Sequence, residues 1–200
     1  MSNFNFVASF YDRLSKLVFQ KSIEKASQQM VNWVTPNSNV LILGGGTGKL
    51  LEQFKHNAVI DYVELSNKMM VRAENRMCVP KVSFYNQDYL LFDTDKQYDY
   101  IICPFFLDLF MPTELKLVLD KIKSELKDNG ELLVLDFSSK NIGWFNLFLL
   151  QVMILFFRLF SGIKIKSYNN LFDEIETKGF EELDGFSKRN NFVLGKKYKP

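Results

Sequence analysis

An apolar run that leads directly into a cluster of glycines constrains this chain more than any other feature. The run is Val40–Leu43, and Gly44, Gly45, Gly46 and Gly48 follow it within the next five positions. Such a run predicts a buried strand, and the apolar spacing after the glycines predicts a helix over residues 47–56. Glycine suits the turn because positive φ angles and close ligand approach both exclude a Cβ. Strand, glycine turn and helix together present backbone N–H groups to a ligand in α/β folds.

The spacing of the glycines distinguishes two nucleotide-binding patterns. Dinucleotide-binding turns follow G-x-G-x-x-G, but here the third position is Lys49, whose side chain would obstruct helix–strand packing. The spacing G-x-G-x-G is met in full by Gly44, Gly46 and Gly48. The next predicted strand, Val59–Glu64, ends in an acid about 20 residues after the glycines, where a carboxylate suits two ribose hydroxyls.

This pattern resembles class I S-adenosylmethionine-dependent methyltransferases, whose motif I reads hydrophobic-acidic-hydrophobic-G-x-G-T/S-G. The stretch Glu64-Leu65-Ser66, with Met69 and Ala73 beyond it, is similar to the acid-x-S…M…A stretch of that family. The resemblance implies S-adenosyl-L-methionine as the cofactor. The cofactor contacts that it implies are Gly44, Gly45, Gly46, Gly48, Glu64, Leu65, Asp88, Tyr89 and Pro104. Within this set the glycines surround the methionine portion, Glu64 binds the ribose and Asp88 accepts from the adenine amine. A surface-turn role is the alternative for Asp88.

One departure from the family pattern keeps other functions open. The acid two residues before the first motif glycine, which helps to anchor the cofactor's methionine end, is Ile42 in this chain. Its absence either weakens cofactor binding or is compensated by another acid. It also keeps open a second hypothesis, a methyltransferase-like binding module without catalysis. A nicotinamide-dependent oxidoreductase is a third hypothesis. Lys49 and the absence of a Tyr-x-x-x-Lys pair count against it.

The order of predicted elements indicates one doubly wound α/β domain. The resemblance implies a Rossmann-like sheet of about seven strands in the order 3-2-1-4-5-7-6, closed by an antiparallel hairpin. We expect an N-terminal helical cap at 1–36, a cofactor-binding core at 37–140, a hydrophobic insert helix at 141–166, and a C-terminal helix and hairpin at 167–200. Further helices are predicted over 67–78 and 112–127, the second ended by Asn129 and Gly130.

Two residues are candidates for the acceptor side of the site. Asp108 is the only ionisable group in the apolar segment after the predicted strand 98–103, and burial would raise its pKa and suit a general base. A helix N-cap or turn role is its alternative. Tyr11 lies in Phe10–Leu14, which resembles the Y-D-R-L opening of the ubiquinone/menaquinone methyltransferase group. A helix-surface position is the alternative for Tyr11. Asp136, at the end of the predicted strand 131–137, either lines the site or caps a turn.

The chemistry of the acceptor is indicated by composition and by one motif. Phe occurs 20 times, which suits an apolar or aromatic acceptor such as a phenol, a quinone precursor or a lipid-like compound. Cys103-Pro104-Phe105-Phe106 lacks the N/D-P-P-Y/F pattern of enzymes that methylate nucleobase amines. A net charge of +2 argues against nucleic-acid binding, and one His with two Cys argues against a metal site.

The segment 144–163 is apolar on nearly every face, although Asn146, Gln151 and Arg158 interrupt it. Such a helix is buried or lies in lipid, and a spanning helix needs about 20 predominantly apolar residues. A span would separate the last strands from the sheet, so a cap over the substrate site ranks first, a peripheral membrane-surface helix second and a span third. With no signal peptide and few cysteines, we expect a cytoplasmic protein, in contact with a membrane if this helix meets one.

Overall fold

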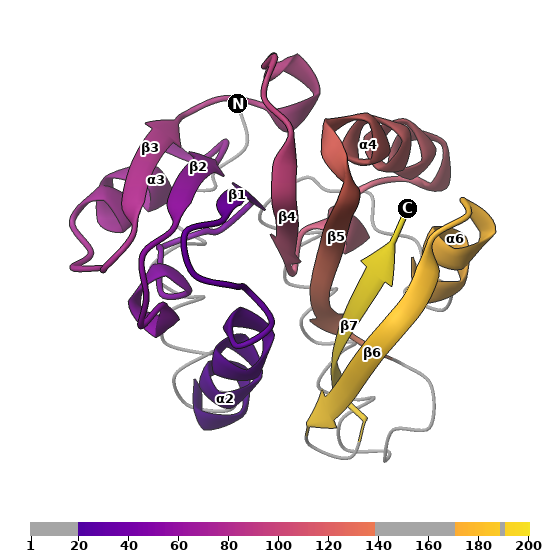
Figure 1. Ribbon diagram of the computed structural model, residues 1–200, viewed down its shortest axis with the longest axis horizontal. Helices are drawn as coiled ribbons and strands as arrows, with labels where there is room; N and C mark the ends of the chain where they lie inside the picture. Colours follow the sequence, from indigo (N-terminus) through magenta and orange to yellow (C-terminus); the bar gives the residue numbers. More distant parts are fainter. Residues whose placement is uncertain (1–19, 139–170, 189–190) are drawn as a thin grey trace.

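The computed structural model describes residues 20–138, 171–188 and 191–200, and its centre is a seven-stranded sheet (Figure 1). The order of the strands is β3-β2-β1-β4-β5-β7-β6, as predicted. All neighbouring pairs among the first five strands are parallel, and β7 runs antiparallel to both β5 and β6. The strands are β1 Asn39–Leu43, β2 Val59–Val63, β3 Lys81–Tyr85, β4 Tyr98–Pro104, β5 Leu126–Phe137, β6 Glu181–Lys188 and β7 Val193–Lys199.

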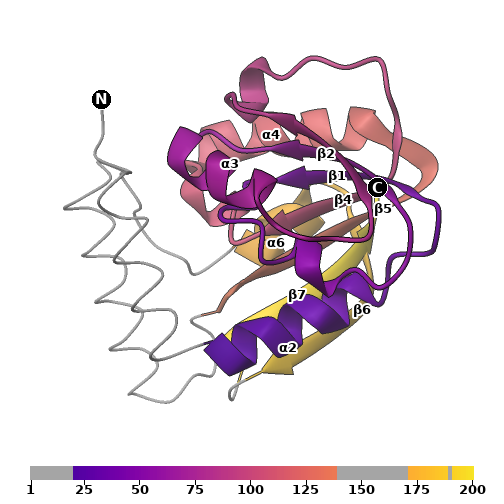
Figure 2. The same ribbon diagram turned by 90° about the vertical axis from the view of Figure 1, so that its left-hand side faces the viewer.

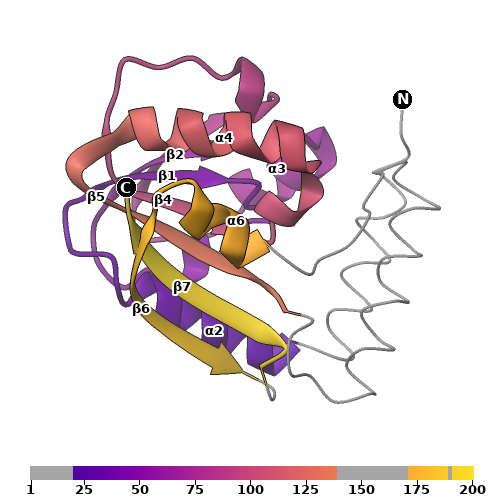
Figure 3. The ribbon, with the colours of Figure 1, turned by 90° about the vertical axis from the view of Figure 1, so that its right-hand side faces the viewer.

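Helices cover both faces of the sheet. Helices α2, Gln20–Val31, and α3, Asn67–Glu74, contribute to one buried apolar cluster, and α4, Pro112–Glu125, and α6, Leu171–Thr177, contribute to the other. Figure 2 shows α2 and α4 on opposite sides of the sheet, and Figure 3 shows α6 on the side of α4. Alternate residues of β1, β4 and β5 contribute to the two clusters, since side chains along a strand point to opposite faces. Because β1, β2, β3 and β4 are parallel, their carboxyl ends lie along one edge of the sheet.

The predicted helix over 47–56 is wrong. The chain there forms loops and a single 3₁₀ turn, η1, Leu51–Gln53. Gly48 has φ +76°, which a right-handed helix excludes, and the stretch that remains before β2 is too short to sustain a helix of its own. Leu51 and Phe54 are nevertheless buried, so the apolar spacing indicated correctly which side chains are buried, although the segment is not a helix.

Several predicted boundaries also need correction. Helix α3 ends at Glu74 rather than near residue 78, and α4 ends at Glu125. Strand β5 begins directly at Leu126, so Asn129 and Gly130 lie inside the strand, next to an irregularity in its pairing with β4. Gly130 is needed there because a Cβ would lie 2.7 Å from the Tyr98 carbonyl oxygen.

Several expectations fall outside the described residues. These are Tyr11, most of the N-terminal cap at 1–36, and the insert helix at 141–166 with its possible membrane contact. Within the described ranges, no helix has the length and apolar character needed to cross a membrane.

Candidate active site

The glycine loop, residues 44–48, follows the carboxyl end of β1 and packs closely against α3. A Cβ on Gly48 would lie 2.7 Å from Cα of Ala73 in α3, so the loop and the helix touch at that position. Gly46 differs, because a Cβ there would meet only Sδ of Met69, at 3.8 Å. Both residues have positive φ angles. The loop therefore has a packed side and, at Gly46, a side with room for a ligand against the backbone.

Glu64 joins the end of β2 to this loop. Its Oε2 accepts a hydrogen bond from the Gly46 N–H at 3.0 Å, and its Oε1 accepts one from the Ser66 N–H at 2.7 Å. The side chain is buried, and desolvation raises the pKa of Glu64, while backbone N–H donors from Ser66, Gly46 and Leu65 oppose the rise. Each carboxylate oxygen can accept a further hydrogen bond, such as one from a ribose hydroxyl.

Tyr62 on β2 also holds the glycine loop, and the sequence analysis did not identify it. It pairs in register with Ile42, the residue in the place of the family's strand-one acid. Its hydroxyl donates to the Gly46 carbonyl oxygen at 3.0 Å, and burial, followed by the charge of Glu64, raises the pKa of Tyr62. A neutral hydroxyl from β2 therefore holds the loop at the level where the family pattern expects a carboxylate from β1. The signal that could have revealed it was the two-residue spacing between Tyr62 on β2 and Glu64 directly after β2, since side chains two residues apart in an extended chain point to the same face.

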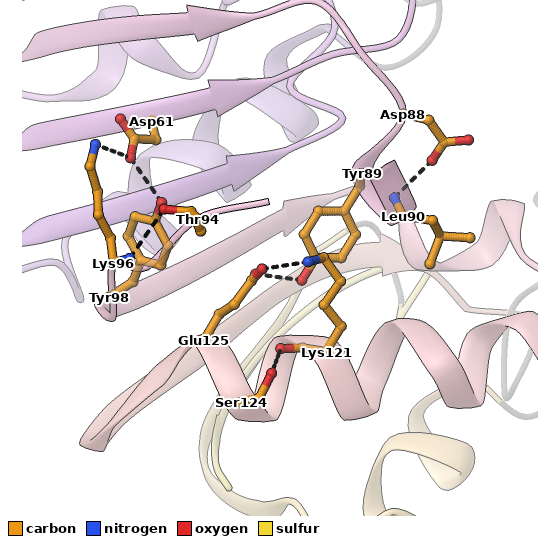
Figure 4. Close-up of polar contacts among 10 residues, drawn as sticks. All are labelled: Asp61, Asp88, Tyr89, Leu90, Thr94, Lys96, Tyr98, Lys121, Ser124 and Glu125. Atoms are coloured by element: carbon orange, nitrogen blue, oxygen red, sulfur yellow. Dashed lines mark hydrogen bonds and ion pairs between the residues drawn. The ribbon is translucent and has the colours of Figure 1, made fainter. Parts of the chain in front are cut away.

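Asp88 follows β3 at the same edge of the sheet. Its Oδ1 accepts a hydrogen bond from the Leu90 N–H at 2.9 Å and so caps the 3₁₀ turn η2, Tyr89–Leu91 (Figure 4). The turn role considered for Asp88 is therefore present. The adenine contact stays a prediction, and the cap engages only one of the two carboxylate oxygens.

The other predicted cofactor contacts differ in what they present. The side chain of Tyr89 is buried, and its hydroxyl donates to Glu125 at 2.7 Å, on the α4 side of the sheet (Figure 4). Only the main-chain groups of Tyr89 are therefore placed to contact a ligand at the edge of the sheet. Leu65 is 62% exposed directly after Glu64, where it can pack against an apolar ring face, and Pro104 ends β4.

A second polar cluster in Figure 4 is structural. Asp61, in the middle of β2, is buried and accepts hydrogen bonds from Lys96 at 2.7 Å and from the Tyr98 hydroxyl at 2.8 Å. These contacts tie the loop before β4 to the sheet. Because Asp61 lies within the strand rather than at its carboxyl end, it takes no part in the edge that carries Glu64 and Asp88.

The edge continues at β4 and β5 with two carboxyl groups. Asp108 lies in the 3₁₀ turn η3, Leu107–Leu109, and is not the N-cap of α4, which is Met111. Asp136 lies near the end of β5 and is fully buried. Burial, followed by the charge of Asp108, raises the pKa of Asp136 well above its ordinary value. The structure therefore brings together the two acids that the sequence analysis considered separately. Within the described residues no group of His, Cys, Asp and Glu is arranged to hold a metal ion.

Known proteins resemble this chain in a segment of sequence and in fold. A family model described as "Methyltransferase domain" matches residues 40–130. A search of curated proteins found no match. Among solved structures, the N-methyltransferase NodS from Bradyrhizobium japonicum in complex with S-adenosyl-L-homocysteine has a TM-score of 0.67 at 14% identity, and the alignment covers 90% of this chain and 87% of that one.

Two further structures share the fold. The magnesium protoporphyrin IX methyltransferase from Synechocystis, with bound S-adenosylhomocysteine, has a TM-score of 0.64 at 19% identity, with 96% of this chain and 94% of that one covered. An S-adenosylmethionine-dependent methyltransferase from Clostridium acetobutylicum has a TM-score of 0.62 at 15% identity, with 98% of each chain covered. A methyltransferase-domain model therefore matches residues 40–130 of this chain, and the chain shares the fold of these solved methyltransferase structures.

Proposed function

We propose that this enzyme transfers the methyl group of S-adenosylmethionine to a small apolar or aromatic acceptor. The observation that carries the proposal is the contact of Glu64 with the Gly46 N–H, which unites the predicted ribose-binding acid and the glycine loop in one place. Asp88 and the carboxyl groups of Asp108 and Asp136 follow along the same edge of the sheet. Ligands of open α/β sheets bind at this edge.

The residues of the chain bind and orient the cofactor. Glu64 would accept hydrogen bonds from the ribose hydroxyls, Asp88 would accept from the adenine amine, and the backbone at Gly46 would lie against the methionine portion. The Tyr62 hydroxyl holds that backbone through its hydrogen bond to the Gly46 carbonyl oxygen. The bound cofactor supplies a methyl group already activated on a sulfonium, so the protein mainly has to hold the acceptor atom about 3 Å away in a site without water.

Aromatic side chains at the ends of β4 and β5 support an apolar acceptor. The rings of Phe105 and Phe137 are tilted against each other with centroids 4.6 Å apart, and those of Phe106 and Phe110 meet edge to face at 5.0 Å. Aromatic side chains beside a site favour a ring or an aliphatic group over a charged one. The resemblance of Phe10–Leu14 to the ubiquinone/menaquinone group supports an aromatic acceptor, with Tyr11 on the acceptor side.

A transfer assay tests this proposal. Methyl-labelled S-adenosylmethionine would be incubated with the full chain and with two panels of acceptors, one of substituted phenols, anilines and quinols and one of nucleobases and short peptides. We expect label in organic-extractable products of the first panel. Label confined to the nucleobases or peptides would contradict the proposal of an apolar acceptor. The absence of transfer to both panels would contradict the proposal that the protein is a catalyst and would favour a binding module.

A further inference from the structure

Asp108 and Asp136 are brought together by an unusual turn at the end of β4. Pro104 pairs with Leu135 in the β4–β5 ladder, so Asp136 lies one residue beyond the last pair. Phe105 has φ +55°, a left-handed conformation that a bulky residue adopts only when its surroundings impose it. Its N–H donates to the Leu135 carbonyl oxygen at 2.7 Å. This turn directs η3 back toward the end of β5 and places Asp108 against Asp136.

Among the described residues, no positively charged side chain is found to compensate the charge of Asp136. Its Oδ1 accepts a hydrogen bond from the Phe137 N–H at 2.8 Å, and the backbone N–H groups of Phe137 and Asp108 oppose the rise in its pKa, but its buried Oδ2 accepts no hydrogen bond from the described residues. The titratable groups that act on it there are Asp108 from η3 and the Cys103 thiol from β4. An acid in this position does not stabilise the fold, because a buried carboxylate costs free energy unless a cation or several donors compensate it.

One proton held between the two carboxyl groups would satisfy this arrangement. Two carboxylates that share a site do not both ionise readily, so one of them keeps its proton near neutral pH. A proton on Asp136 would provide a donor toward Asp108. The pair then carries one negative charge and titrates as a unit. Strained backbone, burial and like charges at the ligand-binding edge of a sheet together indicate a functional rather than a structural role.

We propose that Asp108 and Asp136 form a proton-accepting pair that takes the proton of a phenolic hydroxyl on the methyl acceptor. Asp108 is the catalytic base, and Asp136 is a positioning residue that acts through it. This inference rests on the proposed methyl transfer and narrows its acceptor class. The hydroxyl is chosen because a phenol is a weak nucleophile until its proton is removed, whereas an arylamine already offers a lone pair.

The step balances without another reactant. The hydroxyl oxygen forms a bond to the methyl carbon as the carbon–sulfur bond breaks, and the electron pair of that bond remains on sulfur. The proton of the hydroxyl passes to the carboxylate of Asp108, so the pair changes from one negative charge to none. The products are the aryl methyl ether and S-adenosylhomocysteine, and the pair later returns its proton to water.

The shared proton is tested without any acceptor. Infrared spectra of the full chain at neutral pH would be compared between wild type, Asp108→Asn and Asp136→Asn, with Asp128→Asn as the matched control, since Asp128 is an exposed residue at the other end of β5. We expect a protonated-carboxyl C=O band in wild type and in the control that Asp136→Asn loses and that Asp108→Asn shifts in frequency, because the proton then lacks its carboxylate acceptor. If wild type has no such band, or if Asp136→Asn keeps it, or if Asp108→Asn leaves its frequency unchanged, the pair is refuted.

The acceptor is tested with 4-propylphenol and 4-propylaniline and with labelled S-adenosylmethionine. We expect transfer to the phenol, a loss of about 10²-fold in kcat for Asp108→Asn, and for Asp136→Asn a pH–rate profile that lacks one of the two inflections of wild type. Binding of S-adenosylhomocysteine should be unchanged in both variants, which shows that they fold.

The outcomes separate this inference from the broader proposal. Transfer to the aniline alone, or a pH profile that neither variant alters, would overturn the pair while leaving methyl transfer intact. If wild type bound no S-adenosylhomocysteine, the proposed function itself would fail, and the infrared comparison would still decide whether the two acids share a proton.

Discussion

At the scale of single residues, Tyr62 on β2 and Glu64, the residue directly after β2, both hold the glycine loop. Glu64 accepts a hydrogen bond from the Gly46 N–H, and Tyr62 donates one to the Gly46 carbonyl oxygen, so both backbone polar groups of Gly46 have a side-chain partner. Glu64 was predicted, because an acid at the tip of the second strand is a feature of the sequence pattern. Tyr62 was not, since a single Tyr in a strand is usually explained by packing alone.

We expect Tyr62→Phe to loosen the glycine loop without disturbing the sheet. The change removes one hydrogen bond and leaves the Gly46 carbonyl without this donor, at a cost of about 1 kcal/mol in the free energy of unfolding. Urea denaturation and titration with S-adenosylhomocysteine would measure stability and affinity. Tyr100→Phe is the control, because its buried ring belongs to the same apolar cluster as Tyr62, and the one hydrogen bond that its hydroxyl makes within the described residues is to Thr35, at 3.4 Å. Equal loss of affinity in the two variants would contradict the role given to Tyr62.

At the scale of elements, the helix that the apolar spacing predicted over residues 47–56 is absent, and loops with one 3₁₀ turn take its place. Apolar spacing after the glycines predicted burial of Leu51 and Phe54 correctly, but the left-handed backbone at Gly48 prevents a helix from starting there. The β4–β5 edge shows a similar limit. Asp108 and Asp136 were each recognised as candidates, yet their contact depends on the left-handed turn at Phe105, which nothing in the local sequence requires.

Substitution of Gly48 by Ala tests the contact between the loop and α3. A Cβ there would lie 2.7 Å from Cα of Ala73 and would also impose a left-handed Ala, so we expect a loss of about 2–3 kcal/mol in unfolding free energy. Gly179→Ala is the matched control. Gly179 has φ +83°, but its nearest neighbour is the Lys123 ammonium at 3.6 Å, so only the backbone strain of about 1 kcal/mol applies. Urea denaturation of both variants would show whether close packing adds to strain.

At the scale of the whole molecule, the sheet order was predictable and the acceptor side was not. The alternation of strands and helices, together with the family resemblance, was enough for the order 3-2-1-4-5-7-6, because right-handed crossovers leave few topologies. The site depends instead on side chains from separate elements that meet at one edge. The glycine pattern led to the residues that we propose for its cofactor half, whereas the predicted cap residues, including Tyr11, lie outside the described part of the chain.

The buried Asp136 should affect how the stability of the molecule depends on pH. Its pKa is raised in the folded state, so between its unfolded and folded pKa values the native protein binds more protons than the unfolded chain. Stability from this group is therefore fully present below the unfolded value and is lost as the pH rises toward the folded one, by up to about 1.4 kcal/mol per pH unit. Thermal unfolding of wild type and Asp136→Asn across pH would measure the difference, which should grow in favour of the variant as the pH rises. A difference that stays constant with pH would contradict a raised pKa.

The most direct test of the central claim is calorimetric titration of S-adenosylhomocysteine into wild type, Glu64→Gln and Glu74→Gln, the last being an exposed position on α3. We predict that wild type and Glu74→Gln bind alike. Glu64→Gln should bind about 10- to 100-fold more weakly, since a hydrogen bond to a charged group contributes about 1.5–3 kcal/mol. Equal affinity in all three proteins, or no binding to wild type, would contradict the assignment of Glu64 and the glycine loop to the cofactor.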